Sequence, residues 1–346
     1  MAYSRFRPPL FLGLMASEKR VSTVVSARAG SIVPSVFSDL ALGTDGPCRD
    51  SQRLNAILFM GDRVKHIDCC LSPTVECLSK IRNVGPVIAR KLGPRADVWV
   101  VEAPRFAWNS MACYDCFLPH LNPWGNPHSY DPRGLPAAAT TISVLKDVAS
   151  QVNGQLERSK GRKRMESRAT SSLGKHRTIV MGFSKGGVVL NQLMAELAHL
   201  HGPDHKTRSE KEKEVELGEF ASIPRTSEEF LDSIEQFHYI DVGMNECGAY
   251  TTDDSVLEEI AKVARLRDSG LTVFMHGTPR QWSDPNRGWI SAEKDQCIRQ
   301  LREAGRKFAA NGKLRVEEKT YFADEEPSLD MHFSILEAFD LSVPDL

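Results

Sequence analysis

A glycine–X–serine–X–glycine segment, Gly182–Gly186, holds the residue of this chain best placed for nucleophilic chemistry. The apolar residues TIVMGF run directly into Ser184, and a helical segment with an apolar stripe follows it. This strand–turn–helix setting is typical of a nucleophile elbow, in which a strained turn raises the serine hydroxyl above a sheet. Glycines at positions 182 and 186 suit that turn because neighbouring backbone approaches too closely for a Cβ. The five-residue pattern is short enough to arise by chance, so an ordinary glycine-rich strand–helix turn is the alternative.

A serine nucleophile needs a base, and the base needs a carboxylate that orients it. After an elbow these partners follow in the order serine, acid, histidine, each on a loop after a later strand. The loop after the predicted strand 271–275 carries Asp284. The segment after the last predicted strand carries His332, the only histidine C-terminal to His276. We therefore predict a catalytic triad of Ser184, Asp284 and His332.

Three other side chains compete for roles near this base. Asp241 ends the preceding predicted strand and Asp330 lies close to His332 in the sequence, so either could replace Asp284 as the acid. His276 ends a predicted strand. We expect His276 to line the cleft, where it would contact the substrate or support the catalytic residues.

The oxyanion formed during acyl transfer needs backbone N–H donors. In an elbow, one donor belongs to the residue after the nucleophile, and the second comes from the loop after an early strand. These positions correspond to Lys185 and to Asp62, which follows the apolar run 56–60. In the implied reaction Ser184 attacks a carbonyl carbon, His332 accepts the serine proton, and water later releases the acyl group.

Apolar runs that alternate with amphipathic segments predict the elements that hold these residues. Strands alternating with helices indicate an α/β fold with a mostly parallel central sheet and helices on both faces. The predicted strands are 56–60, 96–103, 178–181, 237–242, 271–275 and 314–322. The predicted helices are 73–92, 135–152, 187–200, 226–236, 255–266, 291–311 and 332–339.

The composition is that of an ordinary folded chain and excludes several classes of function. The chain has 346 residues, 44 Lys and Arg against 45 Asp and Glu, and a formal net charge of −1. This balance argues against nucleic acid or an anionic membrane as the main partner. No stretch is apolar enough to predict an integral membrane segment. Of the eight cysteines, Cys113 and Cys116 form a C-x-x-C without the second pair that a structural zinc site needs. We predict reduced thiols, no metal and no cofactor.

The length alone would allow two domains of about 150 residues, but the pattern of elements favours one. Residues 1–50 differ from the rest, because their first 31 positions carry five Lys or Arg against one acidic residue. We expect a leader there, either disordered or similar to an organellar transit peptide. Residues 51–346 would form a single domain, with polar loop insertions at 155–176 and 203–219.

Several sequence blocks resemble a known family, chromosome 2 open reading frame 69. The resemblance covers most of residues 55–340, with the blocks in the same order and with fitting gaps. It implies an α/β-hydrolase-like fold, an association with mitochondria, and catalytic roles for Ser184, Asp284 and His332. The blocks are FMGD (59–62), CYDCF (113–117), GFSKGGVVLNQL (182–193), YIDVG (239–243), MHGTPRQWSDPNRGWI (275–290) and EEPSLDMHF (325–333).

Residue pattern and resemblance together predict a serine hydrolase that cleaves an ester, thioester or related acyl bond. The expected partner is a small substrate that contains an acyl group, and this class includes lipid-like molecules. The alternative is a hydrolase-fold binding or scaffold protein that keeps the elbow without turnover. The expected location is mitochondrial, with the cytoplasm or another organelle as the alternative.

Overall fold

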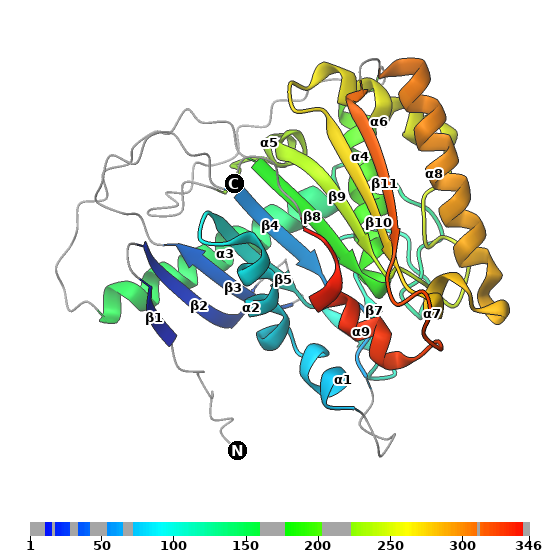
Figure 1. Cartoon of the computed structure of the whole chain (residues 1–346). Coiled ribbons are helices and arrows are strands. Elements are labelled where there is room, and N and C mark those ends of the chain that lie inside the picture. Colours follow the sequence, from blue (N-terminus) through cyan, green and yellow to red (C-terminus); the bar gives the residue numbers. More distant parts are fainter. Residues whose placement is uncertain are drawn as a thin grey trace.

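The computed structural model describes residues 11–15, 18–27, 34–41, 54–64, 72–159, 177–202, 223–309 and 312–341 (Figure 1). Within these ranges the backbone forms a nine-stranded sheet. In spatial order its strands are β1 (Phe11–Met15), β2 (Glu18–Ser26), β3 (Ser35–Ala41), β5 (Ala96–Val101), β4 (Leu54–Phe59), β8 (Arg177–Phe183), β9 (Ile234–Ile240), β10 (Leu271–Gly277) and β11 (Leu314–Thr320).

Most of the sheet is parallel. Every neighbouring pair from β5 through β4, β8, β9 and β10 to β11 is parallel, whereas β1, β2 and β3 pair antiparallel with their neighbours. This topology confirms the predicted α/β class. Because the carboxyl ends of parallel strands meet at one edge, the loops after β4, β8, β9 and β10 gather there, where ligands bind in open α/β sheets.

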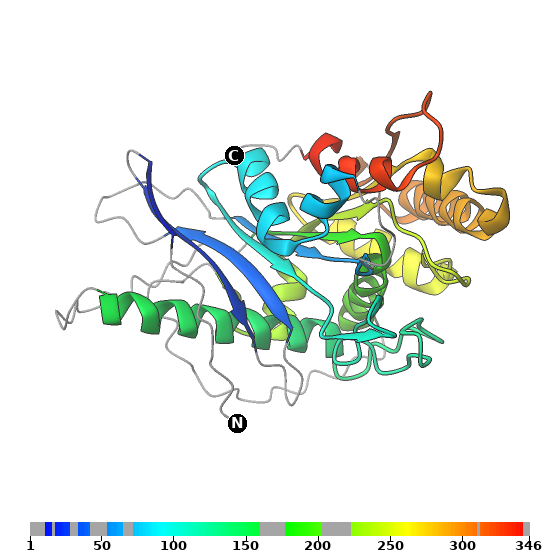
Figure 2. The same ribbon diagram turned by 90° about the horizontal axis from the view of Figure 1, so that it is seen from below.

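Helices cover both faces of the sheet (Figures 1 and 2). Three of them, α1, α2 and α9, pack on one face, and α3, α4, α5, α6 and α8 pack on the other. Within the described ranges, none of the helices combines the length and the apolar character needed to cross a bilayer. The helices are α1 (Pro73–Leu78), α2 (Ile81–Leu92), α3 (Pro136–Ser159), α4 (Gly187–His201), α5 (Ser227–Ser233), α6 (Asp254–Leu266), α7 (Pro279–Trp282), α8 (Gly288–Phe308) and α9 (Leu329–Ala338).

The central strands are apolar on both sides because both sides are covered. All six residues of β4 are buried. Successive side chains of a strand point to opposite faces, so Ala56 and Leu58 join the cluster under α1, α2 and α9. Ile57 and Phe59 join the cluster under α3 and α4. A continuous apolar run is what a parallel strand buried on both faces requires.

The N-terminal boundary of the fold differs from the predicted one. β2 pairs with β1 and β3, and β3 pairs with β5, so these strands extend the sheet. Val21 and Leu40 are fully buried in the core. The prediction of a leader reaching residue 50 is therefore wrong for residues 18–27 and 34–41, whereas residues 1–10, 16–17, 28–33 and 42–50 lie outside the described residues. The physical reason is that β-branched residues of β2 and β3 bury an apolar face, which the basic and serine-rich composition of the segment concealed.

The two predicted insertions lie almost entirely outside the described residues. Helix α3 continues to Ser159, so the first five positions of the predicted insertion 155–176 are helical. Residues 160–176 and the whole of 203–219 fall in ranges that the structure does not describe.

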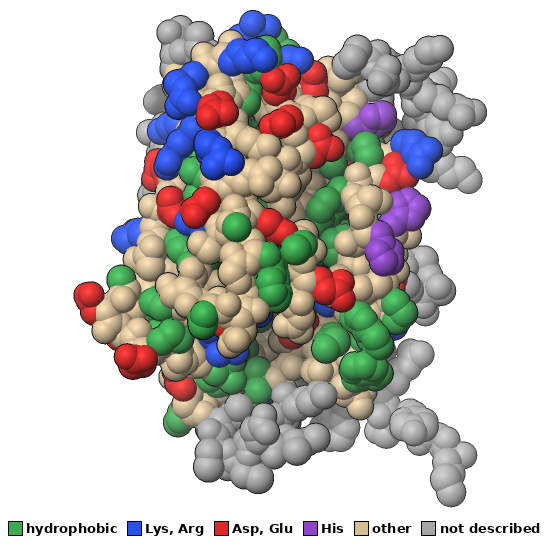
Figure 3. All heavy atoms as spheres, turned by 90° about the vertical axis from the view of Figure 1, so that its right-hand side faces the viewer, with side chains coloured by type: hydrophobic (Ala, Val, Ile, Leu, Met, Phe, Trp, Pro, Cys, Tyr) green, Lys and Arg blue, Asp and Glu red, His purple; other side chains and the backbone are tan. Residues whose placement is uncertain are grey.

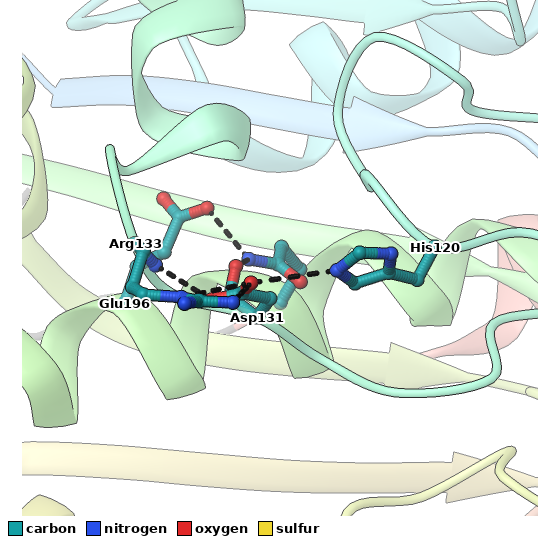
Figure 4. Close-up of polar contacts among 5 residues, drawn as sticks. His120, Asp131, Arg133 and Glu196 are labelled. Carbon is teal, nitrogen blue, oxygen red and sulfur yellow. Dashed lines mark hydrogen bonds and ion pairs between the residues drawn. The ribbon is translucent and has the colours of Figure 1, made fainter.

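A buried carboxylate on α4 joins this helix to the first turn of α3. Glu196 accepts hydrogen bonds from the backbone N–H groups of Ala137 (2.7 Å) and Ala138 (2.9 Å). Gln192 donates both to Glu196 (2.9 Å) and to the carbonyl of Asp131 (2.6 Å), within the cluster drawn in Figure 4. A negative group is favourable at a helix N-terminus, but burial dominates and raises the pKa of Glu196 to about 7. This network holds the segment before α3 against the helix that follows Ser184.

One side of the molecule is formed largely by the solvated face of α8. Ile298 and Leu301 are buried against the core, whereas Arg302, Arg306 and Lys307 are exposed on the last turns. Figure 3 looks onto this side and shows Lys and Arg side chains gathered toward one end of it. The pattern is that of an amphipathic helix with its charged face in water.

Candidate active site

The turn from β8 into α4 places Ser184 at the carboxyl edge of the sheet. Its φ is 52°, in the left-handed region that residues other than glycine seldom occupy. A Cβ on Gly186 would lie 2.1 Å from the carbonyl oxygen of Phe59, and one on Gly182 would lie 2.7 Å from Gly187 Cα. The close backbone approach expected at the two elbow glycines is therefore present, and the turn has the strained geometry of a nucleophile elbow.

A third glycine, which the sequence reasoning did not single out, touches the serine itself. A Cβ on Gly61 would lie 2.4 Å from Ser184 Cβ and 2.9 Å from Ser184 Oγ. Gly61 follows β4, so the loop that begins there packs directly on Ser184. Its position, directly after a buried strand and before Asp62, is the signal that could have identified it.

Asp241 is the carboxylate that contacts the predicted base. It follows β9 directly, is fully buried, and has a φ of 46°. Asp241 Oδ2 lies 2.6 Å from His332 Nδ1 and accepts a second bond from Thr278 Oγ1 (3.0 Å). Asp241 Oδ1 accepts a bond from the backbone N–H of Thr278 (2.7 Å). With three donors on its two oxygens, this carboxylate is fixed in place by the start of the loop after β10.

The imidazole of His332 is held from a second side as well. His332 lies in α9, whose first turn is capped by Ser328, and its side chain is almost fully buried. Its ring stacks on Phe183 with centroids 4.6 Å apart. Because the carboxylate of Asp241 accepts, Nδ1 carries the proton and Nε2 keeps a free lone pair. This arrangement is suited to taking a proton from a hydroxyl.

The prediction that Asp284 orients His332 is wrong. Asp284 accepts a hydrogen bond from the backbone of Asn286 (2.9 Å) and pairs with Arg287 Nε (2.8 Å). It caps the short turn η2 (Pro285–Arg287), and the bond from Arg287 lowers the pKa of its carboxyl. The loop after β10 turns into α7 before it reaches Asp284, which carries this carboxylate away from His332.

Neither Asp330 nor His276 makes a side-chain hydrogen bond to His332 among the described residues. Asp330 is exposed on the first turn of α9 and accepts a hydrogen bond from Ser72 Oγ. His276 does not line the cavity, contrary to the expectation. Its ring bonds to His238 (3.1 Å) and Tyr321 (3.0 Å), and burial lowers its pKa to about 3. It contributes to the site only through its backbone carbonyl, which accepts the N–H of Asp241 (2.7 Å).

Ser184 and His332 open onto the same cavity, which has a volume of about 490 Å³. Apolar and charged side chains share its walls, and they come mainly from the loops that follow β4, β9 and β10 and from the β6–β7 region. The remaining lining residues are Asp62, Arg63, Val64, Trp108, Met111, Trp124, Asn126, Lys185, Gly243, Met244, Asn245, Glu246, Arg280, Gln281, Arg287, Leu329 and Phe333.

One wall of the cavity comes from the hairpin β6 (Arg105–Ala107) and β7 (Met111–Cys113) with the segment that follows it. Trp108 lies in the tight turn of this hairpin and is 64% exposed, and its ring contacts that of Trp124 with centroids 4.3 Å apart. Both rings line the cavity and are exposed, so their apolar faces can contact a bound molecule.

The two residues predicted to supply oxyanion donors both line the cavity, and their side chains are turned to other partners. Asp62 Oδ1 accepts the N–H of Ala112 (2.7 Å), and burial raises the pKa of its carboxyl. Lys185 is almost fully buried, its Nζ donates to the carbonyl of Trp124 (2.6 Å), and burial lowers its pKa.

The C-x-x-C cysteines form no metal site within the described part of the chain. Cys113 and Cys116 are unpaired thiols, and burial raises the pKa of Cys116 to about 12. No group of three or more His, Cys, Asp or Glu side chains in the described ranges is arranged to hold a metal ion.

The mostly parallel sheet, the strained serine elbow after β8 and the later carboxylate and histidine define an α/β-hydrolase fold.

A family model described as C2orf69 matches residues 136–307 of the chain. The mitochondrial protein C2orf69 homolog of Mus musculus is 26% identical over 291 residues, which cover 75% of this chain and 70% of that protein. The homolog of Danio rerio is 29% identical over 270 residues, which cover 76% of this chain and 65% of that protein. The resemblance to the C2orf69 family is thus confirmed.

The human mitochondrial protein C2orf69 is 26% identical over 292 residues and is covered to 66% of its length. The chain therefore spans about two thirds of the relatives that it matches.

Two solved structures show a distant likeness. A thermostable esterase is 12% identical with a TM-score of 0.43, the match covering 92% of this chain and 59% of that one. An S-formylglutathione hydrolase from Agrobacterium tumefaciens is 8% identical with a TM-score of 0.41, covering 95% of each chain. Similarity this low establishes neither an activity nor a substrate.

Proposed function

We propose that the chain is a serine hydrolase in which Ser184 is the nucleophile, His332 the base and Asp241 the orienting acid. The observation that carries this proposal is the 2.6 Å contact of Asp241 Oδ2 with Nδ1 of His332, which lines the same cavity as Ser184. A buried aspartate at Nδ1 fixes the tautomer whose Nε2 can accept a proton. The chain order serine, aspartate, histidine is that of α/β-hydrolases.

In the proposed reaction, Ser184 Oγ attacks the carbonyl carbon of an ester or thioester while its proton passes to His332 Nε2. The tetrahedral intermediate collapses, the bond to the leaving group breaks, and the same proton passes to the departing oxygen or sulfur. Water then gives a proton to Nε2 and attacks the acyl-serine carbonyl. Collapse of this second intermediate releases the carboxylic acid and returns the proton to Ser184, while Asp241 stays ionised and stabilises the imidazolium.

For the oxyanion, we propose the backbone N–H groups of Lys185 and Asp62 as donors. Lys185 follows the nucleophile on the elbow, and the contact between Gly61 and Ser184 brings the loop of Asp62 onto the serine. Such preorganised donors are worth about 3–4 kcal/mol each in related chemistry. The stabilisation develops only as charge forms on the carbonyl oxygen.

We further propose a small acyl-containing substrate and a mitochondrial location. The cavity volume suits a small molecule, and apolar residues such as Met111, Met244 and Phe333 can contact an acyl chain. The location is proposed because the relatives from mouse, zebrafish and human are named mitochondrial proteins.

Hydrolysis of p-nitrophenyl esters with acyl chains of graded length tests the proposal. We expect turnover by the unmodified chain that varies with chain length, and its loss in a Ser184→Ala variant of unchanged thermal stability. If the folded chain hydrolyses none of these esters or the corresponding thioesters, the binding or scaffold function would replace the enzymatic one. Equal turnover by Ser184→Ala would equally contradict the proposal.

A further inference from the structure

The loop after β10, which was expected to supply the catalytic acid, instead brings two arginines to the cavity. Arg280 lies in α7 and Arg287 in η2, and both line the cavity together with Ser184 and His332. Loops at the carboxyl edge of the sheet commonly carry specificity, because a rigid scaffold positions them over the ligand. The two guanidinium groups differ in how their charge is balanced.

Arg287 and two other cations of the cavity have partners within the protein. Arg287 Nε donates to Asp284 (2.8 Å), and another nitrogen of the same group donates to the carbonyl of Arg280 (3.2 Å). Arg63 makes a two-pronged pair with Glu102 (3.1 and 2.8 Å). The Lys185 ammonium donates to a backbone carbonyl. Each of these three cations therefore already pairs with a carboxylate or donates a hydrogen bond within the protein before any ligand binds.

Arg280 has no such partner among the described residues. Its guanidinium is partly buried, makes no ion pair, and donates no side-chain hydrogen bond to the described part of the chain. Its Nε is shielded from solvent and has no acceptor. Burial, and then the neighbouring charge of Arg287, lower the pKa of Arg280. Withdrawing an arginine from water is unfavourable unless an anion compensates it.

The carboxylates of the cavity are not available to compensate Arg280. The charges of Asp241 and Asp284 both act to raise the pKa of Arg280, but the oxygens of Asp241 accept from Thr278 and His332. Asp284 accepts from Asn286 and Arg287. Asp62 accepts from Ala112, and Glu246 accepts from the side chain of Asn122 (3.1 Å). Among the described residues no carboxylate is left to pair with Arg280, so an anionic group of a bound molecule can take that place.

The position of Arg280 is fixed by the packing of α7. A Cβ on Gly243 would lie 2.3 Å from Gln281 Oε1, so α7 rests directly on the loop after β9. Gln281 is 5% exposed and lines the cavity beside Arg280. A binding group on a packed support is held at a constant distance from the nucleophile, as specific recognition requires.

We propose that Arg280 binds an anionic group of the substrate, a carboxylate or a phosphate, so that the chain acts on acyl compounds that carry negative charge. The guanidinium offers the planar, two-pronged donor set that both of these oxyanions accept. This inference rests on the proposed hydrolase function and adds a substrate class to it.

Two matched pairs of substrates test the proposal and distinguish the two kinds of anion. The first pair is p-nitrophenyl butyrate and mono-p-nitrophenyl glutarate, which differ by a carboxylate in the acyl group. The second pair is S-butyrylpantetheine and S-butyryl-4′-phosphopantetheine, which differ by one phosphate in the leaving group. Each is measured with the unmodified chain, Arg280→Gln, Arg280→Lys and the control Arg265→Gln, which removes an exposed arginine of α6.

We expect the unmodified chain to prefer the charged member of at least one pair by about 10- to 100-fold in kcat/KM, the range of a charge-assisted hydrogen bond. Arg280→Gln should remove this preference, mainly through KM. Arg280→Lys should keep part of it, and Arg265→Gln should keep all of it. No preference in either pair, or a preference that survives Arg280→Gln, would overturn the proposal. If Arg280→Gln lowered kcat/KM equally on charged and neutral substrates and shifted the pH profile, Arg280 would act on Asp241 and not on the substrate. This result would also overturn the proposal.

Failure of the hydrolase function itself gives a different result, namely no turnover of any of the four substrates by the folded chain. In that case, calorimetry with the uncleavable ligands S-butyl-CoA and glutaramate tests whether Arg280 binds an anionic group. Binding that Arg280→Gln weakens at least tenfold would support anion recognition, and binding that is absent or unaffected would contradict it.

Discussion

His332 Nδ1 lies 2.6 Å from Asp241 Oδ2, although 91 positions separate the two residues in the chain. Asp241 follows β9 and His332 lies in α9, so the contact forms only when the sheet is assembled. Both side chains are nearly or fully buried, which strengthens the bond between them and excludes competing water. This relationship selects Asp241 over Asp284 as the group that would orient the base.

The first prediction compares these two aspartates directly. Asp241→Asn should lower kcat by about 10⁴-fold, because an amide at this position favours the wrong imidazole tautomer. Asp284→Asn should keep kcat for a neutral ester within about threefold, since Asp284 contacts Arg287 and not His332. Steady-state kinetics of both variants on p-nitrophenyl butyrate make the comparison, with thermal unfolding to verify folding. A larger loss from Asp284→Asn than from Asp241→Asn would contradict the assignment.

A second prediction concerns the contact between the loop after β4 and Ser184. Gly61→Ala should lower activity about 100-fold, because the added methyl would lie 2.4 Å from Ser184 Cβ and must displace the elbow. Gly288→Ala is the matched control, since an added Cβ there meets nothing within 4 Å. The control should retain full activity and unfold at the same temperature or slightly above it. Equal activity of both variants would show that Gly61 does not constrain the serine.

A third prediction concerns how stability depends on pH through Glu196. Its pKa is raised to about 7 in the folded chain from an ordinary value of 4.5. Between these values the unfolded chain releases a proton that the folded chain retains, so the free energy of unfolding falls as pH rises. Above pH 7 the loss contributed by this group is about 3 kcal/mol.

Urea unfolding at pH 5 and pH 8 measures this contribution. Glu196→Gln has no charge to bury, so its stability should fall less between the two pH values than that of the unmodified chain. The other titrating groups are common to both proteins and cancel in the comparison. Identical changes in the two proteins would contradict the raised pKa.

Much of this site could be predicted from the sequence, since the elbow depends on local chemistry. Gly182 lies near the end of a buried strand, Ser184 and Gly186 lie in the turn between this strand and a helix, and the last histidine of the chain lies after the last strand. The acid could not be selected in this way. Asp241 and Asp284 both follow predicted strands, and only the path of each loop decides which of them reaches His332. The turn of α7, set by Thr278 and its bonds to Asp241, determines that path.

The N-terminal strands show a second reason why sequence patterns fail. In residues 18–41, β2 and β3 place serine and charged residues among the valines that they bury, and basic residues are frequent around β2. Their place in the sheet depends on pairing with β5, which lies far along the chain. Long-range pairing of this kind has little effect on local composition. The buried parallel strands, in contrast, are continuous apolar runs that can be recognised in the sequence.

Labelling with a fluorophosphonate probe, read by intact mass and by peptide mapping, tests directly whether Ser184 is an activated nucleophile. We expect one covalent adduct on the unmodified chain, located on Ser184, no adduct on Ser184→Ala, and much slower labelling of Asp241→Asn. A folded chain that takes up no probe, or an adduct that persists in Ser184→Ala, would contradict the assignment of Ser184 as an activated nucleophile.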